Sequence, residues 1–421
     1  MSQFIFKNYS FVDNVASFHY GFDDGRDFTE TVTFNTDDKG YDEDLLDKAL
    51  QLAFVIIGTS YYKTFPTKSV HLDFALDQSQ ANFFNHVYQE GLSQFAFEND
   101  LTRADLATFE FQTDDMAKPL AYQGSGTVAL QSGGKDSLFV ASLLKEKNLP
   151  FSSWYVSSGA RHPHILDDVG AQLITSLRSI DRIALERAGR DGAKNGHVPV
   201  TYILESLAVI QAILLGKNEI IVSIAHEGEE PHHHIGDLAV THQWSKTWRA
   251  EQDFAEYVTR YISPDIHIGS PLRQYSELRV AELFVEHTWD KYGHAFSSCN
   301  VANYRQGNDN TTLKWCGDCP KCANSFVLFA PFLPAEELKS LFHGQDLFSK
   351  PSLTHTFKGL MGIDNVAKPF ECVGEIDELR LAYHMAQARG GYGPLPFEVP
   401  ASTFDYKQTY PSQAWATEML Q

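Results

Sequence analysis

The chain has 421 residues, of which 43% are hydrophobic and 13% aromatic, so it is long and apolar enough for two or three folded domains and is not a disordered chain. Its formal net charge of −20 argues against a nucleic-acid partner, because phosphate contacts require clustered lysine and arginine. The N-terminus lacks a basic segment followed by an apolar run, and the longest apolar run, around 207–215, is too short to span a membrane. We therefore expect a cytoplasmic protein with no membrane partner.

The first third of the chain predicts a unit of mixed strands and helices. Residues 1–40 alternate apolar and polar side chains around Asp23-Asp24-Gly25-Arg26, which is typical of an antiparallel hairpin. Residues 42–57 have the spacing of an amphipathic helix. Residues 69–76 and 107–112 look like further strands, with a helix around 80–91 between them. We interpret residues 1–120 as an N-terminal α+β domain.

From residue 127 onward, strand and helix patterns alternate, which favours a parallel sheet covered on both faces. This α/β domain is expected to span 121–295. Residues 296–421 are expected to form a helical extension that begins with clustered cysteines and ends in a packed loop segment. The predicted strands are a short apolar run that begins at Thr127 and ends before Ser132, 152–156 and 219–224, and the predicted helices are 199–215, 244–262, 276–287 and 334–342.

Between the strand and helix of 127–144 stands Ser132-Gly133-Gly134-Lys135-Asp136-Ser137. Adjacent glycines allow a sharp turn and a close ligand approach, and the following helix presents unpaired N–H groups that attract phosphate. A simple glycine turn that caps a helix is the alternative. The segment resembles the SGGxDS loop of the ATP pyrophosphatases, the PP-loop superfamily of adenine nucleotide alpha hydrolase-like fold. That resemblance implies that Ser132 to Ser137 bind ATP, that Lys135 and Asp136 assist catalysis, and that Asp136 helps to hold Mg²⁺.

Four of the five cysteines, Cys299, Cys316, Cys319 and Cys322, fall within 24 residues. Thiolates at this spacing can surround one ion, and Zn²⁺ prefers four such ligands in a tetrahedron. A closed Cys₄ site leaves no position for a substrate, so we predict a structural zinc. A redox dithiol pair and metal-free buried thiols are the alternatives.

The loop 224–234 follows a predicted strand, at the sheet edge where α/β proteins bind ligands. His226, Glu227, Glu229 and Glu230 are candidates for metal contact or proton transfer, or are solvated. The run His232-His233-His234 is interpreted as a polar loop and not as a metal site, because no companion ligand pattern accompanies it. Ser245 and Lys246 are candidates for substrate contact or simply begin a helix.

Cys372 stands apart from the cluster, in Lys368-Pro-Phe-Glu-Cys-Val-Gly374. It is a candidate catalytic thiol, although single cysteines are more often small buried hydrophobes. Flanking Glu371 and Glu375 would raise the pKa of a thiol unless a cation lies near.

The loop and cysteine cluster together resemble those of the 7-cyano-7-deazaguanine synthases. Those enzymes lack a counterpart of the 120-residue N-terminal unit and of the long C-terminal extension of this chain. A fuller resemblance, over about 15–385, is to the ATP-dependent UDP-N-acetylmuramoyl-L-alanyl-L-glutamate epimerases, the MurL family of bacterial peptidoglycan synthesis. The stretches that carry it are 20–31, 58–63, 196–201, 242–246, 297–300, 315–322 and 368–375.

The MurL resemblance implies conversion of the terminal L-glutamate of UDP-MurNAc-L-Ala-L-Glu to D-glutamate with ATP and Mg²⁺, through carboxylate adenylation, α-proton exchange and hydrolysis to AMP and diphosphate. In such a reaction Cys372, His226 or Glu227 would move the α-proton. Lys63, Arg161, Lys246 or Arg273 would receive the anionic substrate in this acidic chain. An amide- or nitrile-forming synthase and a non-catalytic nucleotide sensor are the alternatives, and the oligomeric state is left open.

Overall fold

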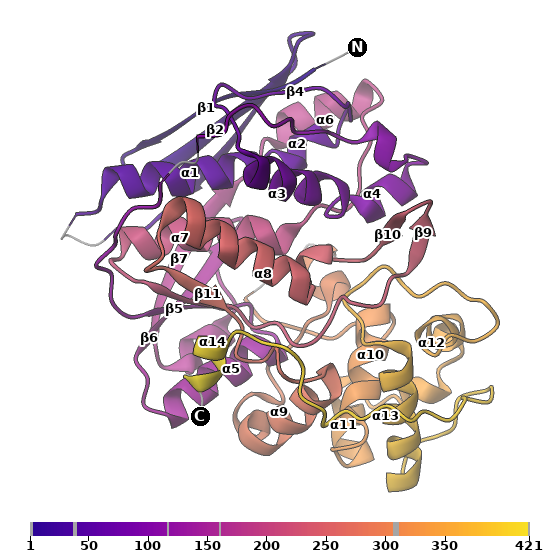
Figure 1. Cartoon of the computed structure of the whole chain (residues 1–421). Helices are drawn as coiled ribbons and strands as arrows, with labels where there is room; N and C mark the ends of the chain where they lie inside the picture. The colour runs from indigo at the N-terminus through magenta and orange to yellow at the C-terminus, as the bar shows by residue number, and fades with distance from the viewer. Residues whose placement is uncertain (1–2, 37–39, 116–117, 160, 306–310, 420–421) are drawn as a thin grey trace.

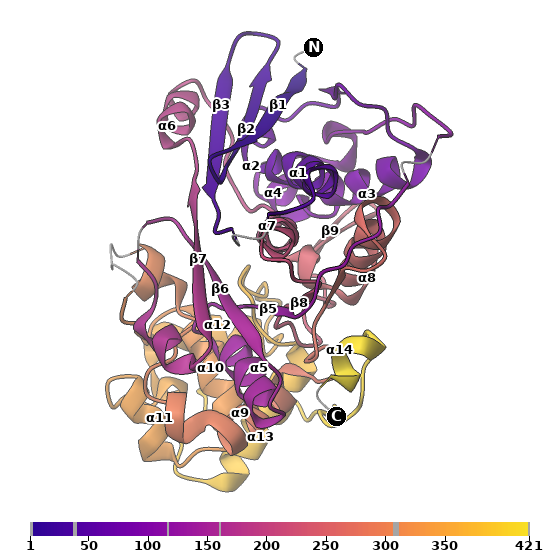
Figure 2. The same cartoon turned by 90° about the vertical axis from the view of Figure 1, so that its left-hand side faces the viewer.

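The computed structural model describes residues 3–36, 40–115, 118–159, 161–305 and 311–419. A nine-stranded sheet runs through most of the molecule, in the order β11-β8-β5-β6-β7-β3-β2-β1-β4 (Figures 1 and 2). Its strands are β1 Phe4–Val12, β2 Val15–Phe22, β3 Asp27–Thr33, β4 Val70–His71, β5 Thr127–Leu130, β6 Phe151–Ser157, β7 Gln172–Ser179, β8 Glu219–Ile221 and β11 His267–Gly269. A separate ribbon pairs β9 His233–Ile235 with β10 Leu238–Val240.

The half of the sheet from β11 to β7 is parallel throughout, as the alternation of strands and helices predicts. Strands β5, β6 and β8 are largely buried on both faces, and neighbouring residues of β5 enter different cores, Val128 one and Ala129 the other. The carboxyl ends of these strands therefore meet at one edge, where the Ser132–Ser137 loop follows β5.

The N-terminal strands extend this same sheet. The predicted hairpin around Asp23–Arg26 is confirmed as the β2–β3 pair, and a second tight turn at Asp13-Asn14, both with positive φ, joins β1 to β2. β3 then pairs antiparallel with β7, with Thr31 opposite Ser179 (Figure 2). The first strands are thus hydrogen-bonded to the parallel half, while the division of the chain at 120 and 295 stays a prediction.

Two strand predictions in the N-terminal part are wrong in extent. Only Val70–His71 of 69–76 pairs as a strand, and 107–112 has no strand at all. In the second case the Asn85 side chain binds both backbone groups of Phe109. Its amide oxygen accepts from the Phe109 N–H at 2.8 Å, and its amide nitrogen donates to the Phe109 carbonyl at 3.0 Å. A side chain thereby satisfies groups that a neighbouring strand would otherwise pair.

Helices cover both faces of the sheet (Figure 1). Those packed on the N-terminal side include α1, α3, α7 and α8, and those on the other side include α5, α9 and α10, followed by the C-terminal helices. The helices are α1 Glu43–Ile57, α2 Thr59–Tyr62, α3 Gln78–Gln89, α4 Ser93–Glu98, α5 Lys135–Glu146, α6 Arg182–Arg190, α7 Val200–Leu214, α8 Trp248–Tyr257, α9 Glu277–Tyr292, α10 Pro320–Phe329, α11 Ala335–Leu341, α12 Thr354–Leu360, α13 Ile376–Arg389 and α14 Ala414–Glu418.

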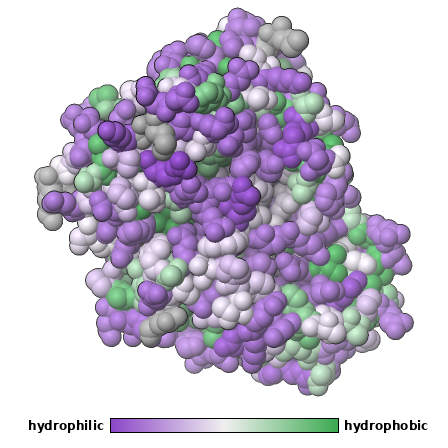
Figure 3. All heavy atoms as spheres, viewed as in Figure 1, coloured by the Kyte–Doolittle hydropathy of each residue, from purple (hydrophilic) through white to green (hydrophobic). Residues whose placement is uncertain are grey.

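The face of the molecule in Figure 3 is mostly hydrophilic, with apolar residues scattered over it. Within the described part of the chain, none of the helices combines the length and the apolar character that crossing a bilayer requires.

Candidate active site

The Ser132–Ser137 loop connects β5 to α5 in a tight turn. Gly133 has φ +78°, and a Cβ there would lie 2.7 Å from Leu313 Cδ1, so only glycine fits. The two serines brace the turn: the Ser132 N–H donates to Ser137 Oγ at 3.2 Å, and the Gly134 N–H donates to Ser132 Oγ at 3.3 Å. Among the residues that the structure describes, no side chain caps the first turn of α5, so its N–H groups are available to bind an anion.

Lys135 is held at the start of α5 by two carboxylates. Its Nζ lies 2.6 Å from Asp136 Oδ1 and 3.5 Å from Glu277 Oε2. Burial alone would lower the pKa of Lys135, but Asp136 and Glu277 raise it above its ordinary value. The lysine therefore remains a cation at neutral pH.

Beside the loop lies a cavity of about 570 Å³, within the range of small-molecule sites. We call it the nucleotide cavity, after the ligand that we propose for it below. Its walls are largely apolar and come from the ends of β5 and β6 and from residues of β7 and α7, with Arg161 and Arg178 as charged members. The lining residues are Leu130 to Ser132, Trp154 to Gly159, Arg161, Arg178, Ile180, Val200, Leu204 and Tyr304.

The four clustered cysteines come together as predicted. Their sulfur atoms all lie within 4.8 Å of one another, with Sγ–Sγ distances of 3.7 Å for Cys299–Cys319, 3.7 Å for Cys316–Cys322 and 3.5 Å for Cys319–Cys322. A tetrahedral zinc with Zn–S bonds of about 2.3 Å has S–S edges of about 3.8 Å. The four thiolates therefore fit a metal such as zinc.

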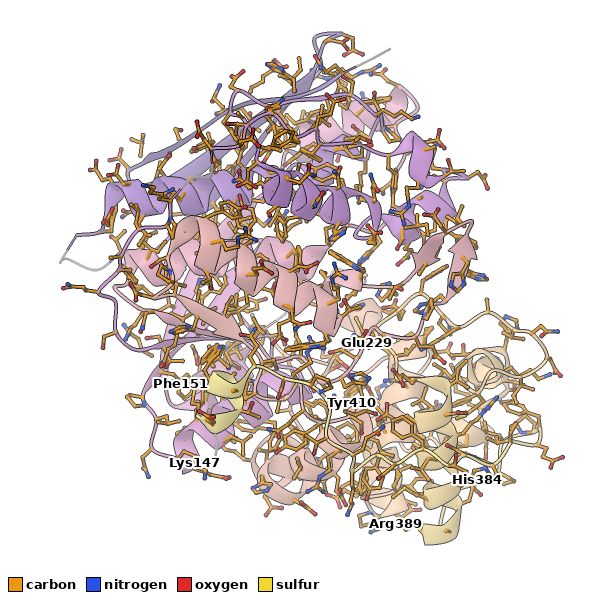
Figure 4. All side chains as sticks on the ribbon, viewed as in Figure 1. Lys147, Phe151, Glu229, His384, Arg389 and Tyr410 are labelled. Atoms are coloured by element: carbon orange, nitrogen blue, oxygen red, sulfur yellow. The ribbon has the colours of Figure 1, made fainter. Side chains whose placement is uncertain are left out.

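A second, much smaller cavity lies between the loop after β8 and the segment 368–375, and we call it the acid–base cavity. Its volume is about 10 Å³, the space of roughly one water molecule. Figure 4 labels Glu229, from the loop after β8, and Tyr410, which stacks on His226 with ring centroids 3.6 Å apart. The lining residues are His226 to Gly228, Glu230, His232, His242, Gln243, Lys246, Glu277, Lys368 and Glu371 to Glu375.

Cys372 and the cation Lys246 line the same cavity. A nearby cation is the condition under which a thiol flanked by carboxylates can be reactive. Lys246 Nζ lies 3.3 Å from Glu227 Oε2. Burial would lower the pKa of Lys246, but Cys372 and the nearby carboxylates raise it above its ordinary value, so the ammonium stays charged.

Glu277, at the first position of α9, connects the acid–base cavity to the Ser132–Ser137 loop. It lines the acid–base cavity and contacts Lys135 of the loop. Burial raises the pKa of Glu277 above its ordinary value, and Lys135 opposes the rise only in part. A carboxyl of this kind can both hold and release a proton near neutral pH. Sequence analysis placed 276–287 in a helix but missed this residue, because only the fold brings it to Lys135.

The histidines of this region are kept neutral. Burial is the main cause that lowers the pKa of His226 and His242 to about 4 and that of His197 and His232 to about 3. The rings of His197 and His242 lie 4.7 Å apart, and His242 Nδ1 lies 2.6 Å from Gln94 Oε1.

The lowered pKa of His242 makes the stability of the protein depend on pH. The pKa of His242 is lower in the folded protein than its unfolded value of about 6.5. As the pH falls below 6.5, the unfolded state therefore binds more protons than the folded state. The stabilisation of the folded state that is present above pH 6.5 is lost toward pH 4. We expect the unfolding free energy of wild type, relative to His242→Gln, to fall by up to about 1.4 kcal/mol per pH unit over this window. Urea denaturation at several pH values measures the difference, and parallel curves for the two proteins would contradict the assignment.

The structure also places the His-rich run and the cations considered for the substrate. The His-rich run is not part of any metal-ligand group found in the described ranges: His233 stacks on Phe97, and His232 contacts the Pro369 carbonyl at 3.1 Å. Arg273 is fully buried against Glu251 at 2.9 Å, so it does not receive a substrate anion in this conformation.

Lys63 also binds within the protein, donating to the Gly196 carbonyl at 2.6 Å, whereas Arg161 lines the nucleotide cavity and Lys246 the acid–base cavity. Of the residues missed, Lys368 is the clearest. It is buried and binds Glu230 Oε2 at 2.6 Å, and its place in the same short motif as Cys372 was the available signal.

Comparison with known proteins assigns the chain to one family. The MurL N-terminal domain model matches residues 1–270, and the MurL C-terminal domain model matches residues 295–396. Three relatives carry the name UDP-N-acetyl-alpha-D-muramoyl-L-alanyl-L-glutamate epimerase. That of Xanthomonas oryzae pv. oryzae is 32% identical over 89% of this chain and 83% of its own length.

The relative from Salinispora tropica is 30% identical over 99% of this chain and 91% of its own length, and that from a Micromonospora species is 30% identical over 94% and 89%. The loop after β8 and the segment 368–375 both fall within matched residues, whereas α9, with Glu277, lies between the two matched ranges. The chain therefore belongs to the MurL family.

Proposed function

We propose that this protein is an ATP-dependent UDP-N-acetylmuramoyl-L-alanyl-L-glutamate epimerase, which inverts the terminal glutamate of a peptidoglycan precursor. One observation carries the proposal: Ser132 of the loop lines a nucleotide-sized cavity, and Lys135 of the same loop contacts Glu277, which lines a second cavity together with Cys372 and Lys246. The family models and the three relatives support the epimerase over the amide- or nitrile-forming synthase and the nucleotide sensor.

In this proposal the chain belongs to the PP-loop superfamily, and ATP occupies the nucleotide cavity. The apolar wall of Trp154, Val156 and Ile180 suits the base, while the α5 N-terminus, the serine hydroxyls and Lys135 suit the phosphates. The Asp136 carboxylate is the kind of oxygen ligand that Mg²⁺ prefers, and the ion would neutralise phosphate charge when bound.

The need for ATP follows from the acidity of the substrate. A proton next to a carboxylate is hard to remove, because the resulting carbanion lies beside a full negative charge. Attack of the glutamate carboxylate on the α-phosphorus of ATP forms an acyl-adenylate and releases diphosphate. The α-proton then leaves to a base, a proton returns to the opposite face, and water cleaves the acyl-adenylate to D-glutamate and AMP.

The acid–base cavity supplies the groups for proton transfer. Cys372 and Glu277 are our candidates for the two faces of the α-carbon, with His226 and Glu227 as alternatives. Lys246 and Lys368 supply positive charge for the anionic substrate and for the enolate that forms. Because the cavity has room for only about one water, a glutamyl group enters only when one of its two walls moves.

The function is tested by incubating the protein with ATP, Mg²⁺ and the UDP-muramoyl dipeptide in D₂O. We expect AMP and diphosphate, and D-glutamate that carries deuterium at its α-carbon. Chiral chromatography of the released glutamate measures its configuration, and mass spectrometry measures its deuterium content. Epimerisation without ATP, or D-glutamate without solvent deuterium, would refute the mechanism.

The role of Asp136 has its own test. Asp136→Asn keeps the size of the side chain and a group that can bind Lys135, but it removes the negative charge expected at the metal. We expect AMP formation to slow about 100-fold, which corresponds to about 2.7 kcal/mol of transition-state stabilisation. Thermal unfolding should change little. Undiminished AMP formation at limiting Mg²⁺ would exclude this residue as a metal ligand.

A further inference from the structure

The segment that carries Cys372 is fastened to the cysteine cluster on two sides. Asn300, which follows Cys299, donates from Nδ2 to Glu371 Oε2 at 2.9 Å. Asn324, two residues after Cys322, accepts the Gly374 N–H at Oδ1, also at 2.9 Å. These bonds reach the residue before Cys372 and the second residue after it. Asn324 is buried, and the Asn324–Gly374 bond is therefore shielded from water.

The other end of the same segment is held by different elements. His232, just before β9, contacts the Pro369 carbonyl at 3.1 Å and stacks on Phe370 with centroids 5.1 Å apart. Lys368 binds Glu230. The Glu371 N–H also donates to the Pro369 carbonyl at 2.8 Å, which tightens the turn before Cys372. Residues 368–370 thus depend on the loop after β8, whereas residues 371–374 depend on the cysteine cluster.

Both asparagines are placed by the cluster itself. Asn300 adjoins a ligand in sequence, and Asn324 lies on the first turns of α10, the helix that begins directly after Cys319 and contains Cys322. A metal that draws the four thiolates together fixes the start of α10 and the Cys299 loop relative to each other. The distance between the two asparagine side chains, and so the shape of 371–374, is then set by the metal.

We infer that Asn300 and Asn324 are positioning residues, through which the metal-bound cysteine cluster holds Cys372 toward the acid–base cavity. The catalytic part of this inference rests on the proposed function, but the positioning part does not. It gives the cluster a role in the reaction although a Cys₄ site offers no open position for the substrate.

The inference is tested with Asn324→Ala, Asn300→Ala and the conservative Asn324→Asp, which keeps the acceptor oxygen. A matched control is Asn303→Ala. Asn303 is equally buried near the cluster and accepts the Lys314 N–H at 2.9 Å, but its hydrogen bonds do not reach 371–374. The readout is the rate of Cys372 alkylation by iodoacetamide, measured on the peptide that contains Cys372, together with zinc content.

We expect both Ala variants of Asn300 and Asn324 to keep about one zinc per chain and to alkylate Cys372 about fivefold to tenfold faster, the effect of losing one hydrogen bond. Asn324→Asp and Asn303→Ala should both alkylate Cys372 at the slow rate of the wild type. With ATP and the muramoyl dipeptide, α-proton exchange should fall more than diphosphate release. Wild-type alkylation rates in both variants, or equal acceleration in Asn303→Ala, would overturn the inference. Because alkylation requires no turnover, these results stand even if the epimerase assignment fails.

Discussion

Replacement of Cys372 with serine is expected to reduce deuterium incorporation at the glutamate α-carbon by about 1000-fold while diphosphate release continues. General acid–base groups contribute about 10²-fold to 10⁴-fold, and a serine hydroxyl is far too weak an acid to replace a thiol whose neighbour is the cation Lys246. The side chains are similar in size, so packing is preserved. Mass spectrometry of glutamate from reactions in D₂O, together with AMP release, separates the two steps.

The same variant decides between the two interpretations of this cysteine. If exchange continues at the wild-type rate, Cys372 is a packing residue, and His226, Glu227 or Glu277 moves the proton. If adenylate formation is lost as well, the substitution has disturbed the nucleotide side of the site. Zinc content and thermal unfolding should match wild type in either case, because Cys372 is not among the four clustered thiols.

Replacement of Cys322 with serine is expected to abolish zinc binding and to unfold the C-terminal helices. Structural zinc in small peptides contributes about 10–16 kcal/mol, which is comparable to the whole stability of a typical domain. Cys299, Cys319 and Cys322 are buried in the core formed by α5, α9 and α10, so loss of the ion would release the Cys299 loop from the start of α10 inside this core.

Elemental analysis and thermal denaturation measure both effects. Wild type should hold about one zinc per chain, and Cys372→Ser serves as the matched control because it removes a thiol but no ligand. Full stability of the metal-free protein would show that the cluster is held by packing alone. In that case Asn300 and Asn324 would position Cys372 without a metal.

The features that sequence analysis recognised are carried by residues close together in the chain. The Ser132–Ser137 loop and the Cys316–Cys322 run have spacings that specify their own geometry, and the β2–β3 hairpin follows from one turn and the alternation beside it. Strand β7 gave no such signal, because its inward position Ser176 is polar. The Ser176 hydroxyl accepts from Trp154 Nε1 at 2.9 Å and donates to Gln211 Oε1 at 2.8 Å, so a buried hydrogen bond replaces the apolar side chain that a strand pattern requires.

The same limit applies to the site. Glu277 and Lys135 are 142 residues apart, and Asn300 and Glu371 are 71 residues apart, so their contacts arise only when α9 packs against α5 and α13 against α10. From residue types alone, such carboxylates and amides cannot be distinguished from ordinary helix and loop residues. The MurL resemblance identified the stretches that contain Asn300 and Glu371, but it did not indicate that these side chains would meet, and Glu277 lies outside those stretches.

The antiparallel pairing of β3 with β7 has a consequence for solubility. Without the first strands, β7 would become a sheet edge with a row of unpaired N–H and C=O groups, next to the partly exposed apolar residues Leu177 and Ile180. Such an edge is a template for pairing with another chain and thus for aggregation. The N-terminal strands therefore cover the edge of the parallel half of the sheet, and a shortened protein that begins after them would be prone to form intermolecular sheets.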